Sequence, residues 1–139
     1  MVEELLSYSQ SDVEDIDALM HVLSETSFCN EDILNRALND ANTHIYVIRE
    51  GGHIIGTATL CILHTLEFTL AHVESVVVLP SCRGRRFGQE LMEKVVFEAK
   101  RLSVKFLQLT SNPQREAANK LYRMMGFTHN ETNFYKLTL

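Results

Sequence analysis

The chain has 139 residues, of which 45% are hydrophobic and 22% charged, enough for one domain (residues 1–139) with a buried core. The formal net charge of −5 argues against general nucleic-acid binding. No apolar run could cross a bilayer, and the first ten residues carry glutamates where a signal peptide has basic residues, so we expect a cytoplasmic protein with no membrane partner.

Three cysteines, Cys29, Cys61 and Cys82, are widely spaced and odd in number. Such spacing favours neither a disulfide framework nor a Cys-x-x-Cys metal site. We therefore expect free thiols and no metal.

The first 41 residues predict one strand followed by two helices. Val2–Ser9 alternates weakly and is typical of an edge strand. Ser11 and Glu14 fit a capping box at the start of a helix from about Asp12 to Glu25. A second helical pattern begins at Asn30. No hallmark of a functional site occurs in this part of the chain.

The middle of the chain predicts three strands. Thr43–Arg49 and His53–Leu63 flank Gly51-Gly52, a hairpin signal. A central strand follows at Leu70–Leu79 and ends with a β-branched valine run. Pro80 ends it, because proline cannot donate to a ladder.

The remaining residues predict two helices and two strands. A helix spans Gln89 to Leu102 and a buried strand spans Val104–Leu109. A helix from Pro113 to Met125 ends at Gly126, and Thr132–Leu139 forms a closing strand. The order β-α-α-β-β-β-α-β-α-β predicts the α/β (α+β) class, with a mixed, mostly antiparallel sheet of about six or seven strands and about four helices.

The turn between the valine-rich strand and the next helix is suited to an anion. Arg83 and Gly84 open this turn, and Gly88 stands near the helix start, where unpaired N–H groups and the helix dipole attract negative charge. Together Arg83, Arg85 and Arg86 suit a few phosphates. The P-loop and dinucleotide glycine motifs are both absent. An ordinary strand-to-helix connection with solvated arginines is the alternative.

This turn resembles the coenzyme A signature of the GCN5-related N-acetyltransferases (GNAT), Arg/Gln-x-x-Gly-x-Gly/Ala after a hydrophobic strand. Arg83 matches the first position and Gly88 the last, but Arg86 replaces the usual middle glycine. A positive φ there would strain the arginine by about 1 kcal/mol. We expect instead an unstrained Arg86 whose N–H and guanidinium contact a phosphate. The resemblance implies the GNAT fold, splayed between strands four and five, where the pantetheine arm enters.

A second block, Thr110–Phe127, resembles Asn-x-x-Ala-x-x-Leu-Tyr-x-x-x-Gly-Phe of the same family. Tyr122, protonated at neutral pH, could donate to the departing thiolate of coenzyme A. Asn119 shares its helix face, and Asn112 lies near the strand end; capping is the alternative role for both asparagines. With both blocks, the expected acetyl-CoA-binding residues are Val76, Val77, Val78, Arg83, Gly84, Arg85, Arg86, Phe87, Gly88, Gln89, Asn112, Asn119 and Tyr122.

The central strand offers a base for the acceptor ammonium. Glu74 could take its proton directly or through water, and His72 is the rival. Strand alternation predicts that His72, Glu74, Val76 and Val78 share one face, and the N–H of Val76 would meet the oxyanion. The alternatives are a cross-strand ion pair for Glu74 and an exposed or hydrogen-bonded His72.

The resemblance implies an acetyl-CoA-dependent N-acetyltransferase that acts on the primary amine of a small molecule by direct attack. Ile55–Ala58 and His72–Val78 look locally like the glucosamine 6-phosphate N-acetyltransferases, although Ser75 departs from the usual acidic residue. The Thr110–Pro113 and Thr132–Tyr135 segments look instead like a broad bacterial group of acetyltransferases. Acetylation of a protein or peptide amine, and a non-catalytic coenzyme A sensor or interaction module, stay open as alternatives. A homodimer is compatible with the sequence.

Overall fold

The computed structural model describes residues 1–139, which divide into two units, Met1–Leu109 and Thr110–Leu139. In chain order the elements are β1 Val2–Glu4, α1 Gln10–Leu23, α2 Glu31–Leu38, β2 Thr43–Glu50, β3 His53–His64, β4 Thr69–Val78, the 3-10 turn η1 Pro80–Cys82, α3 Phe87–Arg101, β5 Leu107–Gln108 and α4 Glu116–Met124. The predicted order of strands and helices is confirmed as far as α4.

The sheet of the first unit has the strand order β1-β2-β3-β4-β5. The first three pairs are antiparallel and β4–β5 is parallel, which confirms a mixed, mostly antiparallel sheet. It has five strands, so the predicted six or seven is wrong. The closing segment Thr132–Leu139 forms no ladder, and its Phe134, Leu137 and Leu139 side chains are exposed. Local strand propensity does not make a strand without a partner to pair with.

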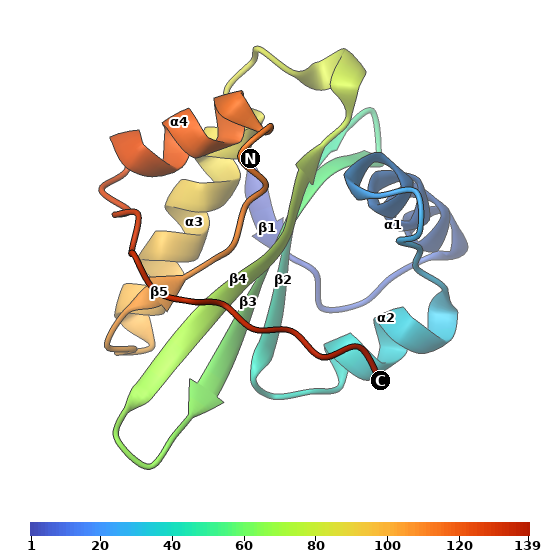
Figure 1. Cartoon of the computed structure of the whole chain (residues 1–139). Helices are drawn as coiled ribbons and strands as arrows, with labels where there is room; N and C mark the ends of the chain where they lie inside the picture. The colour runs from blue at the N-terminus through green and yellow to red at the C-terminus, as the bar shows by residue number, and fades with distance from the viewer. The chain divides into compact units, whose positions relative to one another are not determined.

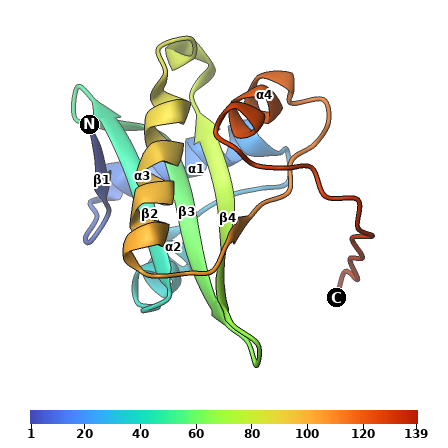
Figure 2. The same cartoon turned by 90° about the vertical axis from the view of Figure 1, so that its left-hand side faces the viewer.

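Helices cover both faces of the sheet in the first unit. Figure 1 shows α1 and α2 on one side of the sheet and α3 on the other, and Figure 2 shows α3 lying along the strands. The face toward α1 and α2 has a continuous apolar core. Its members include Val13, Ile16, Leu19, Leu34, Ile45, Val47, Ile54 and Val77. On the other side, α3 buries Leu91, Met92, Val95 and Ala99. Burial of this apolar surface is the main force that holds the layers together.

A capping box starts α1, two residues earlier than predicted. The Ser9 hydroxyl accepts from the N–H of Asp12 (3.2 Å), and Asp12 Oδ2 accepts from the N–H of Ser9 (3.1 Å). The prediction of Ser11 and Glu14 as the box is therefore wrong. Both serines offer the same local chemistry, but Asp12 has a distant partner that the local sequence does not reveal.

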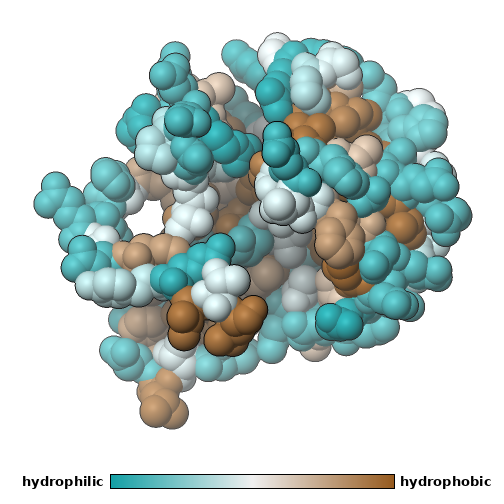
Figure 3. Space-filling model, turned by 45° about the vertical axis from the view of Figure 1, so that its right-hand side comes forward, coloured by the Kyte–Doolittle hydropathy of each residue, from teal (hydrophilic) through white to brown (hydrophobic).

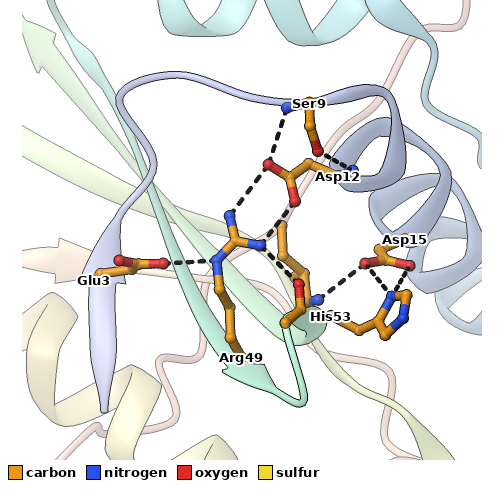
Figure 4. A network of polar contacts seen from close by, with 8 residues as sticks. Glu3, Ser9, Asp12, Asp15, Arg49 and His53 are labelled. Carbon is orange, nitrogen blue, oxygen red and sulfur yellow. Dashed lines mark hydrogen bonds and ion pairs between the residues drawn. The ribbon is translucent and has the colours of Figure 1, made fainter.

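That partner is Arg49 of β2, as Figure 4 shows. The guanidinium donates to both carboxylate oxygens of Asp12 (2.8 and 3.1 Å), and its Nε donates to Glu3 of β1 (2.7 Å). Asp12 is buried, and the hydrogen bonds from Arg49 hold the pKa of its carboxyl below the usual range. Nearby, Asp15 accepts from the N–H of Ile54 (3.0 Å). These contacts tie the start of α1 to three strands.

The exposed surface of the α1–α2 region carries a few apolar side chains, among them Val22, Phe28 and Ile33. On the face drawn in Figure 3, hydrophobic residues form separate patches among hydrophilic ones. None of the helices is long and apolar enough to cross a membrane.

Candidate functional site

A β-bulge interrupts β4 between Glu74, a predicted base, and Val77, one of the valines predicted to bind the cofactor. The ladder with β3 pairs Thr59 with Glu74 but Thr57 with Val77, so two residues of β4 lie opposite one residue of β3. The first of these two, Ser75, has φ 53°, in the left-handed region. Such a bulge bends a strand and redirects its side chains.

The bulge changes which side chains share a face. His72 and Glu74 do lie on one face, as predicted, because their side chains are 3.7 Å apart (Nδ1 to Oε1). Val78 pairs with Gly56, on the opposite face toward α3, so its predicted place beside Glu74 is wrong. Val77 takes that place and packs in the α1–α2 core. Strand alternation fails here because the extra residue shifts the pairing register by one.

Pairing between β4 and β5 is brief. Only Ala71 with Leu107 and His72 with Gln108 form ladder pairs. β5 ends at Gln108, whereas β4 continues to Val78. Beyond these two pairs, β4 has no partner strand on its β5 side, as is expected where two neighbouring strands splay apart.

His72 is held between a carboxylate and an amide. Its Nδ1 faces Glu74, and its Nε2 accepts a hydrogen bond from the Gln108 side-chain amide. The His72 side chain is 34% exposed and that of Glu74 is 56% exposed. His72 is therefore hydrogen-bonded, which is one of the alternatives that the sequence left open for it. Gln108 was missed, because only the register of β4 and β5 brings it beside His72.

Cys61 of β3 pairs with His72 in the ladder and is half-buried. Burial, and secondarily the charge of Glu74, raise the pKa of the Cys61 thiol, which keeps it protonated and weakly nucleophilic. No group of three or more His, Cys, Asp or Glu side chains is placed to hold a metal ion.

The turn after β4 presents backbone N–H groups at the start of α3. No side chain caps the helix, and its first intrahelical bond runs from the N–H of Glu90 to the carbonyl of Arg86 (3.0 Å). The preceding N–H groups of Phe87, Gly88 and Gln89 therefore have no intrahelical partner. The Gln89 side chain donates to Glu93 (2.9 Å), which leaves its backbone N–H as the group suited to an anion.

Arg86 adopts the strained conformation. It has φ 66° and ψ 17°, the left-handed region, so the expectation of an unstrained backbone there is wrong. Gly84 is also left-handed (φ 80°). The chain must reverse between η1 and α3, and the turn imposes this geometry whether or not the residue is glycine.

The three arginines of the turn do not act as one group. Arg85 pairs with Glu50 of β2 through both nitrogens and lies over the ring of Phe87, 4.7 Å from its centroid. Arg83 and Arg86 are exposed and form no ion pair in the structure. Arg85 is therefore engaged in fixing the turn, and the other two guanidinium groups remain available to an anion.

In the second unit, Tyr122 of α4 is buried and contacts Phe127 edge to face, with ring centroids 5.9 Å apart. Burial raises the pKa of its hydroxyl. The Asn119 amide donates to the carbonyls of Asn112 and Arg115 (both 2.9 Å), and Asn112 Oδ1 accepts from the N–H of Gln114 (2.9 Å). Asn112 thus caps the turn before α4, whereas Asn119 lies within α4 and is hydrogen-bonded to local backbone carbonyls; no side chain caps the start of this helix.

Comparison with known proteins identifies relatives over most of the chain. The family model described as Acetyltransferase (GNAT) family matches residues 11–127. A curated relative, an aminoalkylphosphonate N-acetyltransferase of Salmonella typhimurium, is 27% identical over 71% of this chain and 66% of the relative. The chain thus spans just under two thirds of that relative's length.

Two solved structures have the same fold. Glucosamine-6-phosphate N-acetyltransferase of Arabidopsis thaliana matches with a TM-score of 0.80 and 19% identity, over 99% of this chain and 97% of that chain. Aminoglycoside N-acetyltransferase AAC(6')-Iy, in complex with CoA, matches with a TM-score of 0.78 and 17% identity, over 100% of both chains. At these identities the likeness concerns the fold alone.

Proposed function

Because the chain belongs to the acetyltransferase (GNAT) family, we propose that it transfers the acetyl group of acetyl-CoA to the primary amine of a small molecule by direct attack. The family membership confirms the resemblance drawn from the two sequence blocks. The observation that carries the proposal is the uncapped start of α3, the first α-helix after the bulged strand that bears Glu74.

The turn before α3 suits the pyrophosphate of coenzyme A. The N–H groups of Phe87, Gly88 and Gln89 lack intrahelical partners, and the helix dipole favours an anion at this end. The guanidinium groups of Arg83 and Arg86 add positive charge with no carboxylate bound to them. When bound, the coenzyme supplies an activated acetyl thioester and a thiol leaving group.

The chain supplies acid and base groups of the kinds this transfer needs. An acceptor amine must lose a proton before it attacks, and the Glu74 carboxylate or the His72 ring can take it. The leaving thiolate must gain a proton, and we assign that role to the hydroxyl of Tyr122. The raised pKa of Tyr122 keeps this hydroxyl protonated at neutral pH.

The curated relative supports a small-molecule acceptor, because it is named for aminoalkylphosphonates, which are small amines. The feature that we carry over from it is the primary amine.

Two measurements test the proposal. Calorimetry with acetyl-CoA and with desulfo-CoA should detect binding, and thiol release should be stimulated by at least one amine in a panel of aminoalkylphosphonates, aminoglycosides, amino sugar phosphates and short peptides. Absence of coenzyme binding would refute the acetyl-donor assignment. Binding without turnover across the panel would favour the non-catalytic module, and turnover with peptides alone would favour protein acetylation.

A further inference from the structure

A row of side chains crosses the sheet on the face that carries Glu74. The ladders pair Thr43 with Cys61, Cys61 with His72, and His72 with Gln108, on β2, β3, β4 and β5 in turn. Residues paired in a ladder share a face. His72 therefore lies between Cys61 and Gln108, with Glu74 two positions further along its own strand.

The contact with Gln108 fixes which nitrogen of His72 carries the proton. The Gln108 amide donates to Nε2, so Nε2 is the acceptor of the ring. A neutral imidazole has one donor and one acceptor nitrogen, and the proton of His72 is then on Nδ1. Nδ1 lies 3.7 Å from Glu74 Oε1, so this N–H faces the carboxylate.

This arrangement separates the two candidate bases. His72 has no unshared lone pair for a substrate, because Nε2 is occupied by Gln108 and Nδ1 bears the proton. Glu74 is the more exposed of the two, and the contact from His72 reaches only its Oε1. Its other oxygen, Oε2, is in no hydrogen bond or ion pair of the structure.

We infer that Gln108 and His72 are positioning residues that orient Glu74, and that Glu74 Oε2 is the base. This inference rests on the proposed function. The amide of Gln108 sets the tautomer of His72, and the Nδ1–H of His72 faces one oxygen of the carboxylate at 3.7 Å, the side from which it can orient the carboxylate. The proton of the acceptor ammonium passes to Glu74 Oε2 and then to water, which leaves the amine lone pair free to attack.

A matched pair of substitutions tests the positioning role. The amide nitrogen of asparagine occupies the place of histidine Nδ1, and that of glutamine the place of Nε2. His72→Asn keeps the donor toward Glu74 and should retain kcat within about threefold, whereas His72→Gln loses it and should lower kcat about tenfold or more. Equal losses in both variants would show that His72 is itself the base. Full activity in both would show that His72 does not position Glu74 and would overturn the inference.

The tautomer of His72 can be tested by a measurement that does not depend on enzyme turnover. Nitrogen-15 NMR of the wild-type protein should show His72 as the Nδ1–H form, with its signals identified among the six histidines by their loss in His72→Asn. In Gln108→Leu the Nε2–H form should gain population. An Nε2–H ring in the wild type would overturn the inference even for an active enzyme. If the protein were inactive with every amine, the proposed function would be refuted. The NMR spectrum would still decide, independently, whether the tautomer assignment is right.

Discussion

Replacing Arg86 with glycine should stabilise the protein, although it removes a charged side chain from the predicted coenzyme site. Arg86 has φ 66°, where a residue with a Cβ costs about 1–2 kcal/mol more than glycine. Its side chain is exposed and in no ion pair, so little is lost with it. Glycine has more conformational freedom than arginine in the unfolded chain, which offsets about 0.5–1 kcal/mol of the gain from relieved strain. The net gain in unfolding free energy is about 0.5–1 kcal/mol, equivalent to a melting temperature about 2–4 °C higher.

Arg86→Ala is the matched control, because alanine removes the guanidinium and keeps the strain. In denaturant unfolding, the unfolding free energy of Arg86→Gly should therefore be higher than that of the wild type. The unfolding free energy of Arg86→Ala should equal the wild-type value or lie slightly below it. Calorimetry with acetyl-CoA should show both variants weakened by a similar factor, about two- to fivefold, since both lose one exposed phosphate contact. If Arg86→Gly were no more stable than Arg86→Ala, the backbone at this turn would not be strained. Unequal coenzyme affinities would mean that backbone conformation, and not the guanidinium, controls binding.

Four further predictions concern separate parts of the molecule. Tyr122→Phe should lower kcat about 100-fold, measured by thiol release, because it removes the proton donor; unchanged kcat across the pH range would contradict that role. Asp12→Asn should lower the unfolding free energy by about 3 kcal/mol. Since the folded-state pKa of Asp12 is lowered, its contribution is present above about pH 4 and lost on acidification, so the variant's stability should fall less steeply below that pH. Gly56→Ala should cost about 1–2 kcal/mol in denaturant unfolding, because the new Cβ would lie 3.1–3.2 Å from three core methyl groups; an equally stable variant would show that the core yields. Glu50→Gln should raise the KM for acetyl-CoA with little change in kcat, because Arg85 loses the carboxylate that fixes the turn; an unchanged KM would show that the turn is fixed without this pair.

Local sequence was sufficient for the features that depend on near neighbours. Gly51-Gly52 predicted the hairpin between β2 and β3, and both residues have the positive φ that such a turn requires. The valine run followed by Pro80 predicted where β4 ends. The arginine and glycine spacing after it predicted the family, which the match over residues 11–127 confirms. Each of these signals is written within a few consecutive residues.

Features that depend on distant partners were missed or wrongly predicted. Asp12 is the capping partner of Ser9 and also the partner of Arg49, 37 residues away. The bulge at Ser75 and the contact of Gln108 with His72 are consequences of strand register. No residue type in those segments indicates that a bulge or this hydrogen bond will form.

The sequence by itself determined the family, the order of the elements as far as α4, and the chemical groups at the turn and on β4. Only the tertiary structure decided the faces of β4, the conformation of Arg86 and the neighbours of His72. The physical reason is that turns and caps form among adjacent residues. Register and side-chain pairing are instead settled by the ladders and the packed core that join segments far apart in the chain.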